Sequence, residues 1–162
     1  MDSDKINLKD FVSALIHEAT GTNQVDQITL LLLVYLCDWH SCVKYNCRVV
    51  NVQWKVFRHG LADEGLESYL RSSKQDFEVD DINQVVRCLI PPPENIPEQV
   101  RNVINRVVSI YKEREHSGLA TFVLSTYPIL SSSAHSLESI DLLQKAHEYA
   151  EMRDSESSES SS

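Results

Sequence analysis

The most apolar stretch of the chain, residues 27–39, reads QITLLLLVYLCDW and constrains the fold more than any other segment. Residues 30–37 form an unbroken apolar run, and a helix that is apolar on every side is buried in a protein core. The run is far shorter than the ~18 apolar residues that a membrane span needs, so we expect no membrane association. We predict a central buried helix over residues 26–45, which Asp26 caps and which Asn46 ends in the left-handed conformation.

Apolar residues at helical spacing predict further helices before and after this one. The clearest pattern starts at Pro97 and ends near Arg114, where one face carries Val100, Val103, Ile104, Val107, Val108 and Tyr111. Shorter patterns predict helices over residues 8–20, 62–70, 80–89, 119–127 and 140–152. Residues 47–52, which are rich in valine, indicate a strand or an extended connection.

These patterns predict a mainly α protein, a compact helical domain around one central buried helix with at most a small β element. The chain has 162 residues, which is enough for one domain with a substantial core. The domain is predicted to cover residues 1–152. Residues 153–162, RDSESSESSS, have nothing apolar to bury and are predicted to form a disordered tail.

The formal net charge of −9 indicates the kind of partner. An acidic surface repels a phosphate backbone and suits a basic protein partner better, so nucleic acid is not expected. The first residues, MDSDKINLKDF, lack the basic and apolar regions of a signal peptide. The sequence therefore predicts a cytoplasmic protein whose four cysteines are reduced.

A cluster of metal-binding residue types raises the alternative of a small metal-dependent enzyme. Cys37, His40, Cys42, Cys47 and His59 fall close together in the sequence, but no CxxC pair is present. Cys42 lies about 140° from Cys37 around a helix, so the two thiols face different sides. Because no catalytic motif is present either, we expect no enzyme activity, no metal and no cofactor.

A nucleic-acid-binding regulator is a second alternative, because the helices around residues 116–118 have helix-turn-helix spacing. The helix that would read base edges, residues 119–127, contains no Lys, Arg, Asn or Gln. The alternative therefore depends on whether the basic residues of the preceding helix form one exposed stripe; these are Arg101, Arg106, Lys112 and Arg114.

The far end of the central helix is where a working surface is expected. An unpaired buried carboxylate is costly, so Asp38 is predicted to pair with Arg58 or with a backbone amide. Trp39 is the better candidate for a partner contact, whereas Trp54 is expected in the core. The run Arg58-His59-Gly60 is predicted to be a turn that either faces solvent or presents a loop to a partner.

The order of these features resembles the Panacea domain, a family that includes SocA-like proteins. The helix motif is carried by Tyr35 and Asp38, the helix end by Asn46, and the following aromatic residue by Trp54. Gly60 stands at the family's aromatic-Gly-Pro turn, although Leu61 replaces the proline. Two further correspondences are Pro128, which follows a helix, and Asp141, which opens the last one.

The resemblance implies a binding module and no catalyst. Panacea proteins act as antitoxins that neutralise a toxin by direct contact, and some deliver a bound protein to a protease. The expected partner is therefore a protein, a toxin first, and otherwise a protease or a host protein bound by a phage or mobile-element accessory protein. We predict that Trp39, His40, Arg58 and His59 form the contact patch, which Asp38 and Gly60 shape.

Overall fold

The computed structural model describes residues 5–57, 60–114, 116–132 and 139–160. In these ranges the chain forms seven helices and six strands. The helices are α1 (Leu8–Thr20), α2 (Gln27–Tyr45), α3 (Leu66–Ser72), α4 (Glu98–Lys112), α5 (His116–Leu124), α6 (Tyr127–Leu130) and α7 (Leu142–Ser160). The strands are β1 (Gln24–Asp26), β2 (Gln53–Phe57), β3 (Gly60–Glu64), β4 (Phe77–Asp80), β5 (Val85–Cys88) and β6 (Ser139–Ile140).

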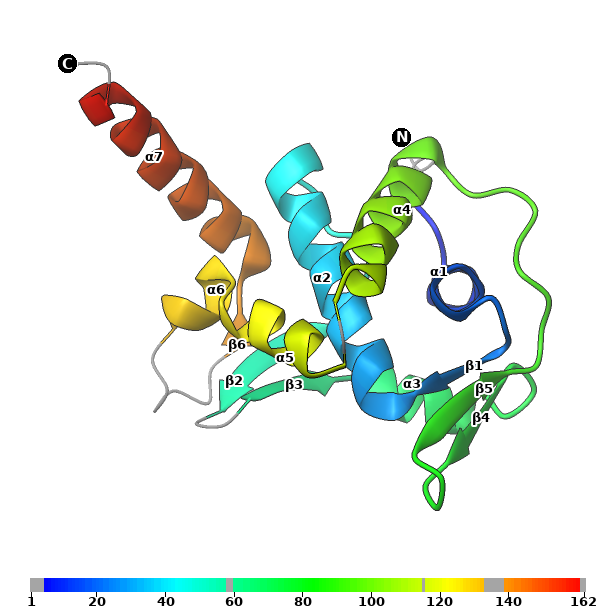
Figure 1. Cartoon of the computed structure of the whole chain (residues 1–162). Helices are drawn as coiled ribbons and strands as arrows, with labels where there is room; N and C mark the ends of the chain where they lie inside the picture. Colours follow the sequence, from blue (N-terminus) through cyan, green and yellow to red (C-terminus); the bar gives the residue numbers. More distant parts are fainter. Residues whose placement is uncertain (1–4, 58–59, 115, 133–138, 161–162) are drawn as a thin grey trace.

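Helix α2 is the centre of the fold, as predicted from its apolar run. It packs against α1, α4, α5 and α7 (Figure 1), and its side chains from Leu33 to Trp39 are all buried. The Asp26 carboxylate accepts the Thr29 amide proton at 3.1 Å, which confirms the predicted cap. Asn46 ends the helix with φ of 55°, which confirms the predicted left-handed residue.

The prediction of a mainly α protein with at most a small β element is wrong. The strands form two three-stranded antiparallel sheets, ordered β1-β5-β4 and β3-β2-β6. The predicted strand region, residues 47–52, is an irregular connection, and the first strand of the second sheet begins just after it, at Gln53. The protein therefore has a mixed α and β architecture, and α2 follows β1 and precedes β2 in the chain (Figure 1).

A β-hairpin takes the place of the helix predicted over residues 80–89. Strands β4 and β5 pair with Asp80 opposite Val85, and Gln84 in the connecting turn has φ of 55°. Asp80 Oδ1 accepts the amide protons of Ile82 and Asn83 at 3.1 and 3.0 Å. A short Asp side chain that binds backbone two and three residues on favours a turn over a helix, which explains the error.

The helix predicted over residues 62–70 is also partly replaced by a strand. Strand β3 pairs along its whole length with β2, from Gly60 opposite Phe57 to Glu64 opposite Gln53. Gly65, with φ of 113°, separates this strand from helix α3, and residues with side chains rarely adopt that conformation. The apolar residues of 62–70 are therefore divided between strand β3 and helix α3. The prediction treated them as one helical pattern and missed the strand.

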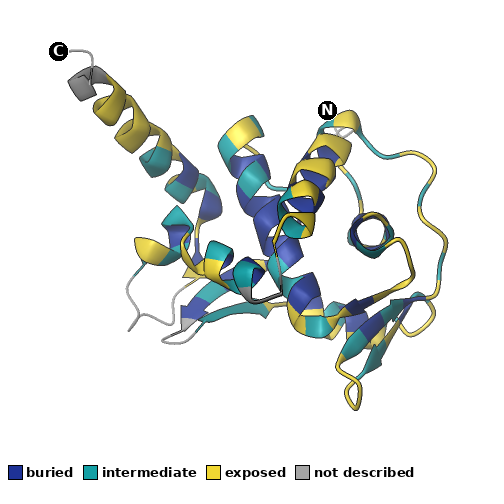
Figure 2. Cartoon of the chain, viewed as in Figure 1, coloured by how far each residue is buried: buried dark blue, intermediate teal, exposed yellow. Residues whose placement is uncertain are grey.

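Helix α7 continues into the segment predicted to be disordered, residues 153–162, and reaches Ser160. Its outer half, from Ala150 to Ser157, is exposed (Figure 2). No Gly or Pro interrupts the segment, and adding residues to an existing helix gains one hydrogen bond each. Disorder was predicted from the lack of burial alone, whereas the helix here extends from the turns that pack on the body. Within the described residues, no helix combines enough length with enough apolar character to cross a membrane.

Candidate functional site

Asp38, predicted at the surface end of α2, is fully buried and lies at the centre of a polar cluster. Its carboxylate is 2.6 Å from Arg48 Nη2 and accepts the Val49 amide proton at 3.1 Å. Trp54 Nε1 donates a third hydrogen bond to it at 2.9 Å. The prediction that Asp38 pairs with a backbone amide is confirmed. The cation beside it is Arg48, while Arg58 and His59 lie outside the residues that the structure describes.

This cluster ties three segments together. Arg48 also donates to the backbone oxygen of Val52, so its guanidinium joins the Asp38 carboxylate to the end of the connection before β2. The Trp54 side chain is buried, as predicted, and its ring meets that of Tyr35 edge to face at 5.5 Å. We interpret Asp38 and Trp54 as residues that hold α2 against β2.

Trp39, predicted as a partner contact, is buried instead. Its ring lies 5.8 Å from that of Tyr149 on α7, and Tyr149 in turn lies 5.7 Å from Tyr127. His40 is half-buried, and burial together with the cations Lys44 and Arg106 lowers its pKa. Trp39 is therefore part of an internal contact between α2 and α7, with only 9% of the residue exposed.

The other residues that carry the Panacea resemblance make contacts within the fold. Tyr35 and Thr126 share a hydrogen bond of 2.8 Å between their hydroxyl groups, and burial raises the pKa of Tyr35. Pro128 is buried in the first turn of α6. Asp141 accepts the Gln144 amide proton at 3.1 Å at the start of α7. These side chains position helices around α2 and leave a binding site to be found elsewhere.

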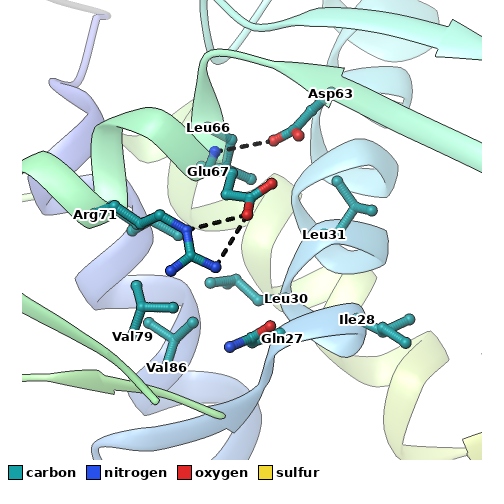
Figure 3. A pocket seen from close by; sticks show the side chains of 11 residues that line it. Gln27, Ile28, Leu30, Leu31, Asp63, Leu66, Glu67, Arg71, Val79 and Val86 are labelled. Carbon is teal, nitrogen blue, oxygen red and sulfur yellow. Dashed lines mark hydrogen bonds and ion pairs between the residues drawn. The ribbon is translucent and has the colours of Figure 1, made fainter. Parts of the chain in front are cut away.

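An apolar pocket of about 190 Å³ opens beside the first turns of α2 (Figure 3). Helix α3 and the β4–β5 hairpin form its other walls, and β3 contributes Asp63. Its apolar lining comes from side chains on four of these elements: Ile28, Leu30, Leu31, Leu66, Leu70, Val79 and Val86. The pocket is the candidate functional site, because concave apolar surfaces with a few polar groups are where ligands bind.

The mouth of the pocket exposes apolar surface to solvent. Ile28 is 62% exposed, although it belongs to the segment predicted to be a folding element only. Leu31 is half-buried and lies one turn further along the helix, so the two side chains share one side of α2 (Figure 3). The apolar run in the sequence predicted burial for all of these residues and carried no signal that the first turn would reach the surface.

Charged residues border the apolar lining. Arg71 binds Asp81 through two hydrogen bonds of 2.8 Å. It also lies 3.0 Å from Glu67, and Figure 3 shows this second pair. Hydrogen bonds from Arg71 and Gln27 lower the pKa of Asp81 to about 2. Asp63 differs, since its carboxylate accepts the Glu67 amide proton at 3.3 Å and forms no ion pair among the described residues. Burial raises the pKa of Asp63.

The residues that raised the two alternative functions occupy separate positions where the structure describes them. Within the described residues, no three His, Cys, Asp or Glu side chains gather to hold a metal ion. Cys37 and Cys42 are buried, and Cys47 is exposed. On α4, Arg101 and Arg106 are exposed but lie about 140° apart around the axis, so they do not form the single stripe that nucleic acid binding would need.

Comparison of the chain with protein families, curated proteins and solved structures finds no match.

Proposed function

We propose that this protein binds a segment of another protein in the pocket beside α2. The observation that carries the proposal is the apolar surface at its mouth, where Ile28 is 62% exposed above a lining of buried Leu30 and Leu66. An exposed apolar side chain over a concave apolar site favours a partner that covers it. The net charge of −9 favours a basic partner, because opposite charge speeds the encounter of two proteins.

The resemblance to the Panacea domain supplies the biological role that we propose. The protein acts in the cytoplasm as an antitoxin that neutralises a basic toxin by direct contact, or as an adaptor that delivers the bound protein to a protease. A phage or mobile-element accessory protein that binds a host protein would use the same pocket. In each case the contact is steric and electrostatic. The bound segment of the partner is covered and can no longer reach the partner's own targets.

A growth assay with the neighbouring reading frame tests the role. The frame is expressed from an inducible promoter, and co-expression of this chain is expected to restore growth if the frame encodes its toxin. Ile28→Glu places a charge at the pocket mouth and should abolish the rescue. Leu130→Glu is the matched control, because Leu130 is 71% exposed on α6 and does not line the pocket.

Folding of both variants is compared by thermal unfolding before the growth assay. Both substitutions are at exposed positions, where a change in the free energy of unfolding stays within about 0.5 kcal/mol. Equal rescue by the wild type and both variants would contradict the pocket. A neighbouring product that is neither toxic nor bound by the purified chain would contradict the antitoxin role.

A further inference from the structure

We infer that the segment held in the pocket carries a Lys or Arg that pairs with Asp63, next to an apolar side chain that fills the lining. The inference rests on the proposed protein-binding function and names the chemistry of the bound segment. Its basis is the contrast between Asp63 and the other carboxylates around the pocket.

Glu67, the other carboxylate that lines the pocket, already has a cation, and so does Asp81 behind the lining residue Arg71. Asp81 and Glu67 share the guanidinium of Arg71, which lies 2.8 Å from the first and 3.0 Å from the second. With both carboxylates in place, the single positive charge of Arg71 is already matched, so it attracts a carboxylate of a bound segment only weakly. This rim therefore offers an acidic segment little positive charge to bind.

Asp63 is the pocket carboxylate that has no cation among the described residues. It is half-buried in the pocket wall, its hydrogen bond from the Glu67 backbone amide is long at 3.3 Å, and burial raises its pKa. Partial withdrawal from water weakens hydration of the charged form, so an added cation gains more here than at an open surface. A carboxylate accepts several donors at once, so the Glu67 amide leaves capacity for a further one.

The apolar lining determines what accompanies the cation. Lys and Arg have long apolar stems that lie along apolar surface while the charged end reaches a polar group. Ile28 and Leu31 on one side and Leu66 on the other present such a surface next to Asp63 (Figure 3). A volume of about 190 Å³ accommodates a side chain or two and excludes a folded domain. The fitting occupant is thus a short basic and apolar segment of a larger protein.

Selection from a displayed library of random short peptides tests this inference on the full chain. We expect enrichment of peptides in which Lys or Arg adjoins a Leu, Ile, Val or Phe. The enriched peptide is then synthesised, and its dissociation constant is measured with the wild type, Asp63→Asn and Glu64→Gln. Glu64 is the matched control, because it neighbours Asp63 on β3, points to the other face and pairs with Lys55 at 2.8 Å.

Asp63→Asn is expected to weaken binding about tenfold or more, because a hydrogen bond to a charged group is lost in a partly dry site. Glu64→Gln should change the dissociation constant by less than about twofold, because Glu64 is an exposed charge on the opposite face of β3. Replacing the peptide's Lys or Arg by norleucine should weaken binding to the wild type and leave binding to Asp63→Asn unchanged. This loss of additivity is the specific sign of a direct pair.

The following results would overturn the inference. Enriched peptides without a basic residue, or equal affinity for Asp63→Asn and the wild type, would show that Asp63 does not select the occupant. If butylammonium alone bound as tightly as the peptides, the pocket would take free amines and not a protein segment. If the selection enriched uncharged peptides and Ile28→Glu abolished their binding, the pocket would still bind a protein segment. The proposed function would then stand, and only the requirement for a basic residue would fail. A selection that yields no peptide sensitive to Ile28→Glu would remove both.

Discussion

The indole nitrogen of Trp54 donates a hydrogen bond of 2.9 Å to the carboxylate of Asp38, and both side chains are fully buried. The bond joins the middle of the central helix to a strand of the β3-β2-β6 sheet. The partly exposed Arg48 balances the charge of Asp38, so the buried carboxylate is not left without a cation. Such pairs contribute most when every polar atom is satisfied, and no unsatisfied buried side-chain polar atom exists among the described residues.

Removing one member of this cluster should destabilise the protein strongly. Asp38→Ala leaves the partly buried Arg48 guanidinium without its anion, and breaking a buried pair costs about 3 kcal/mol or more. Trp54→Phe keeps most of the ring but removes one hydrogen bond to a charged carboxylate, which should cost about 1.5–3 kcal/mol. Urea unfolding measures both changes. A free energy of unfolding lowered by less than about 1 kcal/mol in Asp38→Ala would contradict a dominant role for the cluster.

Tyr149 is expected to keep Trp39 away from solvent. The two rings meet edge to face at 5.8 Å, an arrangement that contributes about 0.5–1.5 kcal/mol beyond burial. Tyr149→Ala should therefore loosen α7 and make Trp39 accessible. Acrylamide quenching of tryptophan fluorescence measures this, because Trp54 is fully buried and contributes little to the quenched signal. Met152→Ala, at an exposed position of the same helix, should leave quenching unchanged.

Asp81 should make the hairpin sensitive to acid. Hydrogen bonds from Arg71 and Gln27 lower the pKa of Asp81 to about 2, below its ordinary 3.8. A carboxyl group with a lowered folded pKa stabilises the fold above its unfolded pKa and loses that contribution as the pH falls through the folded pKa. The loss should fall between about pH 4 and pH 2 and should be smaller in Asp81→Asn. Urea unfolding across this range checks the difference; parallel curves for the two proteins would contradict it.

Asp63 should have the opposite effect on stability. Burial raises the pKa of Asp63 in the folded state, so folding becomes less favourable as the pH rises from its unfolded pKa through its folded pKa. Asp63→Asn should therefore raise the melting temperature at neutral pH and have little effect at acid pH. Differential scanning calorimetry at both pH values measures this. A lower melting temperature for Asp63→Asn at neutral pH would show that the Asp63 carboxylate stabilises the fold despite its burial.

Only one of the four cysteines should react with an alkylating reagent in the native protein. Burial raises the pKa of Cys37 well above its ordinary value and that of Cys42 to about 12, so neither provides thiolate at moderate pH. Cys47 is exposed, and Cys88 is buried with its thiol donating to the Ile90 carbonyl at 3.3 Å. Iodoacetamide should label Cys47 alone in the native protein, and all four thiols in denaturant. Peptide mass spectrometry reads the result, and native labelling of Cys42 would contradict it.

Local signals made the helical half of the fold predictable. The caps of α2 depend on Asp26 and Asn46 alone, each acting on backbone within a few residues. The valine stripe of α4 recurs at helical spacing and is buried as predicted. The strands were missed because a segment such as 85–88 becomes a strand only through its pairing with β4 and β1, residues that its own pattern does not specify.

The candidate site was less predictable than the fold. An ion pair for Asp38 followed from the cost of burying a charge, but the identity of the cation depended on the path of residues 47–52. The exposure of Ile28 depends on how much of the first turn of α2 is covered by α3 and by the β4–β5 hairpin. No local pattern in the sequence specifies that tertiary contact. Trp39 was predicted at a wet helix end because nothing in residues 26–45 indicates that Tyr149 will cover it.

Both sheets are completed by strands from distant parts of the chain. Val25 of β1 pairs with Val86, and Trp54 of β2 pairs with Ile140. During synthesis, therefore, the β2–β3 hairpin and the core tryptophan emerge from the ribosome long before their last partner strand exists. The open edge of β2 must wait for β6, and contacts this far apart in sequence slow folding. A chaperone that shields that edge during translation would act while this sheet is still unfinished.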